Sequence, residues 1–239
     1  MNIEDILNRR SDLSTFLVHF TRSYEGASAI QNLESILDLG AIRALTALGA
    51  ARDDELPLGA PNQRVVCFSE TPLEHAWTLC EEIIGRSIRL EPYGLVFTKA
   101  YGRRRGVNPV WYTDITPGHD WLMKAVNKLA DHAIKQPPGD LTHQILKLTP
   151  FIEQMGTPAQ RRKEFWWERE WRVVGDFQFF LDGVVAVLSP ANQHLRLQTV
   201  IDGIRWEGRK PSLLDPRWSP ERMVATLSGI RHDTGAIPD

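Results

Sequence analysis

The residues best suited to chemistry lie in one acidic and aromatic run, residues 164–174. Read as a strand, this run places Glu168, Glu170 and Arg172 on one face, because successive side chains of a strand alternate between faces. Neighbouring carboxylates repel, so one must titrate high or a cation such as Arg172 must compensate. A carboxylate in a cleft can stabilise an oxocarbenium-like centre, or orient a sugar hydroxyl and activate a nucleophile. The alternative is an amphipathic strand whose glutamates pair with arginines on neighbouring strands.

A second polar group ends the first apolar run of the chain, residues 16–20. His19 can donate a hydrogen bond to a ribose hydroxyl, and Thr21 offers its own hydroxyl two residues on, on the same strand face. Polar groups at a strand end can face a cleft while the rest of the strand is buried. The alternative, which we favour for a histidine taken alone, is a core histidine bonded to a backbone carbonyl.

Several motifs of common enzyme classes are absent from the sequence. It contains no G-x-G-x-x-G, no Walker-A lysine loop, no G-x-S-x-G and no H-E-x-x-H. The seven histidines are scattered, and Cys67 and Cys80 form neither a disulfide framework nor a zinc motif, so we expect no metal site. A metal-dependent nuclease built on the acidic residues 53–55 is a weaker reading, because no lysine stands at a useful spacing from them.

Length and charge bound the remaining classes. The 239 residues suit one domain, and a net charge of −2 excludes a general electrostatic grip on nucleic acid. The longest apolar runs are far shorter than the roughly 20 residues that span a bilayer. The N-terminus is acidic and lacks the apolar core of a signal peptide, so we expect a cytoplasmic protein with no membrane partner.

The order of the expected elements indicates an α+β protein, because strands and helices do not alternate regularly. Capping-box spacing at Ser28 and Gln31 predicts a helix that Gly40 ends, and Ser219 before Pro220 predicts a last helix. Apolar spacing predicts a helical pair at 120–155, inserted within a single α+β domain of residues 1–239. Leu122, Val126, Leu129 and Ala133 would form the buried face of its first helix. Expected strands cover 16–20, 65–69, 94–98, 110–112, 168–175 and 184–189, and a further helix covers 73–84.

Taken together, these segments resemble the ADP-ribosyltransferase pattern. The resemblance is carried by His19-x-Thr21, a helix ending in Leu37-x-x-Gly40, Phe68-Ser69 and Glu170-x-x-Val173. It implies split antiparallel sheets with a helical insertion, NAD as substrate and no metal. It also implies that a histidine and a hydroxyl residue hold the ribose and nicotinamide, and that a late-strand glutamate is catalytic.

Carried over residue by residue, the resemblance implies two sets of site residues. The implied catalytic residues are Glu170, with His19 and the preceding acidic residue Glu168. The residues implied to bind NAD are His19, Thr21, Arg22, Ser69 and Tyr93. Phe20 stands where the family has glycine, and Trp77 and Tyr93 are both candidates for the aromatic that stacks on nicotinamide.

A second resemblance spans residues 16–175. The chain is similar to bacterial abortive phage resistance proteins of the AbiGi type. The similarity lies in the segments 67–73 with His75, 93–99, Gly106-x-x-Pro109-Val110-x-Tyr112 and Glu168-x-Glu170-Trp171-Arg172. It implies a role in phage defence or a toxin–antitoxin system. The basic residues Lys99 and 103–105, in an expected turn, would contact a phosphate-bearing ligand or simply be solvated.

Two functions follow as hypotheses. In the first, a phage-defence protein uses NAD to modify a nucleic-acid or protein acceptor. In the second, a non-catalytic module binds a nucleotide or a cognate toxin or antitoxin, with the 120–155 helices and the aromatic strand as its interface.

Overall fold

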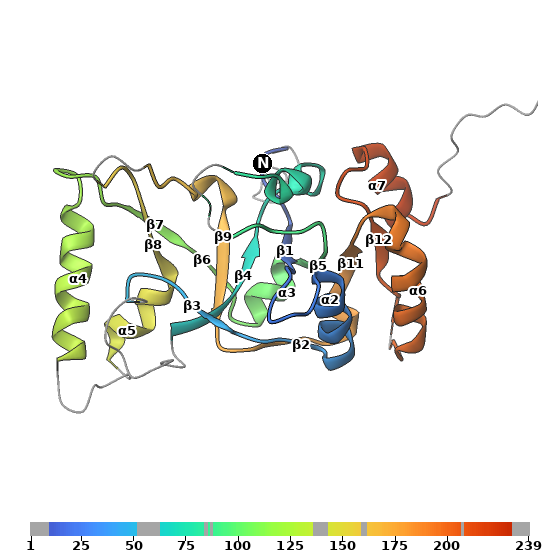
Figure 1. The fold of residues 1–239 in the computed structure, drawn as a ribbon, viewed down its shortest axis with the longest axis horizontal. Helices are drawn as coiled ribbons and strands as arrows, with labels where there is room; N and C mark the ends of the chain where they lie inside the picture. The colour runs from blue at the N-terminus through green and yellow to red at the C-terminus, as the bar shows by residue number, and fades with distance from the viewer. Residues whose placement is uncertain are drawn as a thin grey trace, which may run out of the picture. The chain divides into compact units, whose positions relative to one another are not determined.

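The computed structural model describes residues 10–51, 63–83, 86, 88–135, 143–158, 162–206 and 208–230. Contacts divide the chain into two compact units, and each unit combines segments far apart in sequence (Figure 1). The first unit contains Met1–Gly40, Thr71–Lys99 and Phe180–Asp239, and the second contains Ala41–Glu70 and Ala100–Phe179. That residues 1–239 act as a single domain stays a prediction.

The first unit is built on four strands in the order β12-β11-β5-β1. They are β1 (Phe16–Phe20), β5 (Gly94–Thr98), β11 (Val184–Leu188) and β12 (Ser212–Leu214). β5 runs antiparallel to both of its neighbours, and β12 runs parallel to β11. The side chains of Leu95, Val96 and Phe97 are wholly buried. A strand covered on both faces in this way has a continuous apolar sequence, which is why the sequence marks β5 so clearly.

Local sequence signals mark the ends of two helices of the first unit. The helices of this unit are α2 (Ala29–Leu39), the 3₁₀ helix η2 (Leu73–Cys80), α6 (His194–Gly203) and α7 (Pro220–Leu227), with short 3₁₀ turns η5 (Leu181–Gly183) and η6 (Ala191–Gln193). Ser28 and Gln31 form the predicted capping box of α2, and Gly40 ends it with a left-handed φ of 60°. The Ser219 side chain accepts from the backbone of Arg222 and caps α7 as predicted. The sequence reading missed α6.

The strands of the second unit centre on the order β4-β9-β6. β4 (Arg64–Ser69), β9 (Glu170–Val174) and β6 (Asn108–Pro109) are antiparallel, and β3 (Thr46–Ala47) also pairs with β4. β7 (Trp111–Asp114) and β8 (Ile152–Met155) form a parallel pair, and β10 (Phe177–Gln178) pairs with β2 (Ala41–Ile42). The α+β prediction is confirmed, although two of the strand pairs are parallel rather than antiparallel.

The segment predicted as a helical pair, 120–155, contains two helices and a strand. α4 (Trp121–Ile134) and α5 (Gln144–Leu148) lie side by side next to β7 and β8 (Figure 1). The 3₁₀ turn η3 (Thr149–Phe151) then leads into β8. The last residues of the segment are therefore sheet rather than helix, and they place Glu153 on a strand.

The buried face of α4 differs from the predicted one by about one residue. Met123, Val126, Ala130 and Ala133 are buried, whereas Leu129 is 53% exposed. Both sets recur at helical spacing, so periodicity alone does not choose between them. Asp120 makes no capping bond and instead pairs with Lys124, with 2.9 Å between the charged atoms.

The predicted basic turn at 103–105 is wrong for Arg103 and Arg104, which lie in a helix, α3 (Lys99–Arg104), and the turn begins only at Arg105. The Arg105 guanidinium that follows lies 5.2 Å from the ring centre of Tyr101 and donates to the Gln178 carbonyl at 3.0 Å.

Among the described residues, no helix is long and apolar enough to cross a membrane.

One close backbone approach is needed where β5 meets β1. A Cβ atom at Gly94 would lie 2.4 Å from the carbonyl oxygen of His19, and real Cβ contacts are essentially never that short. We therefore expect Gly94→Ala to lower the stability by about 1–3 kcal/mol, since either strand must shift. Thermal unfolding followed by circular dichroism measures this loss.

Gly203→Ala is the matched control, because nothing lies within 4 Å of a Cβ there and the residue ends α6. Its melting temperature should stay level or rise, since alanine favours helix. An alanine at position 94 that costs no more than the one at 203 would contradict the close approach.

Candidate active site

The start of β9 positions the predicted catalytic glutamates differently from the sequence reading. The run 164–174 is not one strand: a 3₁₀ turn, η4 (Trp166–Glu168), precedes Arg169, whose φ of 47° and ψ of 54° are left-handed. β9 begins only at Glu170. Glu168 therefore does not share a strand face with Glu170, and that prediction is wrong. The pairing of Glu170 with Arg172 on one face is confirmed.

The buried carboxylate of Glu70 holds the turn before β9. One of its oxygens accepts from the indole of Trp171 at 2.6 Å, and the other accepts from the Arg169 guanidinium at 3.0 Å. The hydroxyl of Ser69 donates to the carbonyl of Glu168 at 2.7 Å. A left-handed non-glycine residue costs on the order of 1 kcal/mol, and such strain persists only when its surroundings fix it. These bonds supply that support directly beside Glu170.

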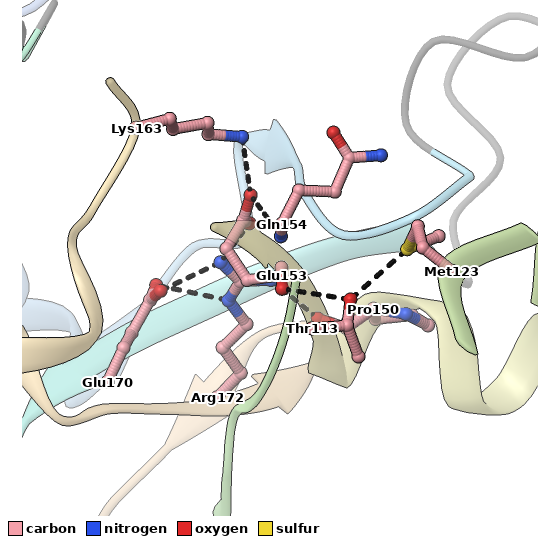
Figure 2. A network of polar contacts seen from close by, with 8 residues as sticks. All are labelled: Thr113, Met123, Pro150, Glu153, Gln154, Lys163, Glu170 and Arg172. Atoms are coloured by element: carbon pink, nitrogen blue, oxygen red, sulfur yellow. Dashed lines mark hydrogen bonds and ion pairs between the residues drawn. The ribbon is translucent and has the colours of Figure 1, made fainter. Parts of the chain in front are cut away.

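The carboxylate of Glu170 is held by two bonds from Arg172 (Figure 2). Nε donates to Oε1 at 3.0 Å and Nη2 donates to Oε2 at 2.7 Å. The backbone N–H of Glu170 donates to the hydroxyl of Tyr112 at 3.1 Å. Two-point contact with a guanidinium fixes the plane of a carboxylate and places a positive charge beside it. The side chain of Glu170 is 17% exposed, so it is not sealed off from solvent.

Arg172 is almost wholly buried and binds three acceptors. Nη2 also donates to Glu153 at 2.7 Å, and Nη1 donates to the Pro150 carbonyl at 2.7 Å. Lys163 donates to the other oxygen of Glu153 at 3.0 Å. Glu170, Arg172, Glu153 and Lys163 form a chain of alternating charge with no net charge, here called the four-residue charge chain (Figure 2). Buried charges are tolerated when paired and hydrogen-bonded in this way.

The ionisation of the neighbouring groups follows from burial. Burial alone would lower the pKa of Arg172. The nearby negative charges, first that of Glu170, outweigh this effect, so the net result is a pKa above the ordinary value of arginine. Burial raises the pKa of Cys67, the cross-strand partner of Arg172, well above its ordinary value. Burial likewise raises the pKa of the Tyr112 phenol. At neutral pH the arginine is therefore charged, while the thiol and the phenol are neutral.

The predicted NAD-binding residues of the first unit gather where β1 ends and β5 begins. His19 is paired with Leu95 across the two strands. Thr21 is buried, and its hydroxyl donates to the Ala29 carbonyl at 2.9 Å while its N–H donates to the Tyr93 carbonyl at 2.8 Å. Because the Thr21 hydroxyl already donates its proton to a backbone carbonyl, it can only accept a hydrogen bond from a ligand.

The loop after Thr21 is fixed from two sides. Asn32 donates to the Arg22 carbonyl at 2.8 Å, and both the N–H and the hydroxyl of Ser23 donate to Glu91. The Arg22 guanidinium lies 5.8 Å from the ring centre of Tyr24. The backbone at Arg22 is therefore held in place by these hydrogen bonds. In Tyr93, whose carbonyl accepts from Thr21, burial and then the charge of Glu91 raise the pKa of the phenol.

The other candidate for stacking on nicotinamide, Trp77, lies on η2. It is 41% exposed and lines a shallow depression together with Glu81 and Arg217, which form an ion pair at 3.1 Å. The acidic residues 53–55 of the nuclease alternative lie outside the described residues. Within those residues, no three His, Cys, Asp or Glu side chains are grouped to hold a metal.

The predicted site residues therefore fall into two groups, one in each unit. His19, Thr21, Arg22 and Tyr93 belong to the first unit, and Ser69, Glu168 and Glu170 belong to the second. That the two groups act on one NAD stays a prediction. Sequence reasoning missed Glu70, Glu153 and Lys163, which lack a local signal because their partners are distant in the chain or on an unpredicted strand.

These features define an α+β protein with a carboxylate held by a buried arginine. The family described as "Putative abortive phage resistance protein AbiGi, antitoxin" matches residues 51–198. This is more than half of the chain, and the chain belongs to that family. No curated protein matches it.

Two solved structures resemble the chain weakly, and both are of DarT from Thermus sp. 2.9. The complex with NAD+ is 14% identical, with a TM-score of 0.37, and the match covers 85% of this chain and 96% of that chain. The complex with ADP-ribosylated single-stranded DNA is 13% identical, with a TM-score of 0.38 and coverage of 87% and 97%. TM-scores this low carry no argument about the site, which rests on the residues described above.

The charge chain makes a direct prediction about stability. Arg172→Met removes the shared cation and leaves the buried Glu153 and the largely buried Glu170 side chain with Lys163 as the one remaining cation of the four-residue charge chain. We expect a loss of about 3–5 kcal/mol in the free energy of unfolding. Urea unfolding followed by tryptophan fluorescence measures it.

Asp202→Asn, which breaks an exposed ion pair with Lys210, is the control and should change the free energy by less than about 1 kcal/mol. Similar small losses for both variants would show that Arg172 is not the shared cation.

Proposed function

We propose that this phage resistance protein is an ADP-ribosyltransferase that uses NAD as its substrate. The glycosidic bond between ribose and nicotinamide would break, nicotinamide would leave, and a nucleophilic atom of the acceptor would bond to the ribose carbon and lose its proton. The acceptor would be a nucleic acid or a protein. The observation that carries the proposal is the carboxylate of the partly exposed Glu170 side chain, which two bonds from Arg172 hold in a fixed plane.

Glu170 suits this reaction because it is an anion with acceptor capacity left over. A carboxylate has about four acceptor sites, and the two bonds from Arg172 occupy one on each oxygen. The Cys67 thiol is also hydrogen-bonded to Glu170, and the acceptor capacity that is left can accept from a ribose hydroxyl. The negative charge can also stabilise the ribosyl cation that develops as nicotinamide departs, and such preorganised charges contribute most in a water-poor site. Glu168, on the turn before β9, would orient the acceptor.

The predicted residues of the first unit would hold NAD in position for the reaction, and His19 is among the implied catalytic residues. His19 would donate to a ribose hydroxyl, and Arg22 would pair with the pyrophosphate, since arginine forks match phosphate oxygens. The resemblance to ADP-ribosyltransferases also assigns Thr21, Ser69 and Tyr93 to binding. Thr21 and Ser69 both donate their hydroxyl protons to backbone carbonyls, so they would serve NAD as acceptors only.

Glu170→Gln tests the assignment of the catalytic carboxylate. The amide keeps the shape but carries no charge, so we expect nicotinamide release to fall about 100-fold or more while the melting temperature changes little. Mass spectrometry after incubation with NAD and candidate acceptors measures both nicotinamide and the modified acceptor.

Glu164→Gln, in a glutamate on the same chain segment that pairs with Arg162, is the matched control and should leave turnover unchanged. Equal turnover by the wild type and Glu170→Gln would count against the proposal, as would no turnover by either with any acceptor.

The outer face of α4 favours a second candidate function, the binding of a cognate toxin. Trp121 is 74% exposed and Leu129 is 53% exposed, and Ala125 lies between them on the same exposed helix face. Exposed tryptophans are frequent anchors of protein interfaces. The word antitoxin in the family's description agrees with such a role.

Trp121→Ala tests this second function. The side chain is mostly exposed, so we expect little change in melting temperature but at least a tenfold weaker complex with the product of a neighbouring toxin-like gene. Isothermal titration calorimetry measures the affinity, and Trp111→Ala, a similarly exposed tryptophan on β7, is the control. Unchanged affinity in Trp121→Ala would exclude the α4 face as the binding surface.

A further inference from the structure

Glu153 is a buried acid that the proposed mechanism does not use. Its residue is 7% exposed, and it lies on β8 at the end of the 120–155 segment. It is linked to Glu170 through Arg172, because a single nitrogen, Nη2, donates to both carboxylates at 2.7 Å (Figure 2). The two acids therefore share the positive charge of one guanidinium.

Sharing changes what Glu170 can do. If Arg172 bound Glu170 alone, the tight bidentate pair would cancel most of the negative charge that a developing cation needs. The negative charge of Glu153 offsets part of the positive potential that Arg172 produces at Glu170. Lys163, which pairs with the other oxygen of Glu153, in turn offsets part of the charge of Glu153. Such effects are large where side chains are buried, because the effective dielectric constant is low there.

We infer that Glu153 is a positioning residue for Glu170 that acts through Arg172. It keeps the guanidinium in place, together with the Pro150 carbonyl, and it leaves the Glu170 carboxylate oriented but not neutralised. The inference rests on the proposed function, in which Glu170 is catalytic. It also assigns a purpose to the 120–155 segment, which supplies both Pro150 and Glu153 to the site.

Charge-balance rescue tests the inference. Glu153→Gln removes one negative charge from the four-residue charge chain at nearly constant side-chain shape. We therefore expect kcat for NAD turnover to fall roughly tenfold with KM for NAD unchanged. Adding Lys163→Met removes one positive charge and should raise kcat above that of Glu153→Gln without reaching the wild-type value, because Arg172 is then paired with Glu170 alone. Lys163→Met alone should not lower kcat. Asp202→Asn and Lys210→Met repeat the two substitutions in an exposed ion pair and should change neither constant.

A purely structural role for Glu153 predicts a different pattern. The double variant would then be slower than Glu153→Gln, because it has lost two buried partners instead of one. That result would overturn the inference, as would a rise in KM with kcat unchanged.

A measurement without NAD separates failure of this inference from failure of the proposed function. The unfolding midpoints in urea are compared for Glu153→Gln, Glu170→Gln and the double variant. Because either acid alone can still pair with Arg172, we expect the double variant to lose more than the sum of the two single losses. Additive losses would overturn the shared arginine. If the loss of stability in the double variant exceeds the sum of the single losses but the protein never consumes NAD, then Arg172 is shared by the two acids and only the catalytic proposal is rejected.

Discussion

The buried guanidinium of Arg172 is the constraint on which the second unit depends. A guanidinium that is almost wholly buried is tolerated only if its N–H groups find hydrogen-bond partners and its charge is paired. Here the partners come from three places in the sequence. Glu170 lies two residues away on the same strand, while the Pro150 carbonyl and Glu153 come from η3 and β8. The strand, the 3₁₀ turn and the 120–155 segment must therefore be in register before the arginine can be buried at all.

The turn before β9 serves the same arrangement. Glu70 follows β4 and binds both Arg169 and Trp171, so the end of one strand fixes the start of its neighbour. This fixation holds Arg169 in a left-handed conformation that an arginine rarely adopts. The carboxylate of Glu170 consequently leaves the turn at a defined point, with its orientation set by the backbone on one side and by Arg172 on the other.

Local signals predicted the parts of the fold that depend on local physics. The Ser28–Gln31 capping box, the stop at Gly40 and the Ser219–Pro220 start all lie within a few residues of the helix end that they determine. The pairing of Glu170 with Arg172 also followed from strand alternation.

Other features have no local signal. Glu168 was misplaced because the left-handed residue after it is arginine, not glycine, and the contacts that hold it there come from Glu70, 99 residues away. The buried face of α4 was misjudged because its sequence offers two apolar faces at helical spacing. Only the packing of α4 on α5 and β7 selects Met123 and Ala130 over Leu122 and Leu129. Glu153 was not found because its strand is formed by pairing with β7.

The discontinuous first unit has a consequence for the newly made chain. β5 is the central partner of β1 and β11, and β11 in turn pairs with β12, which ends at Leu214. While the ribosome is still translating the second unit, β5 lacks one of its two neighbours and leaves an apolar edge open to other chains. The first unit therefore completes its sheet only after translation passes residue 214, and earlier termination would yield a fragment prone to aggregate rather than a smaller working protein.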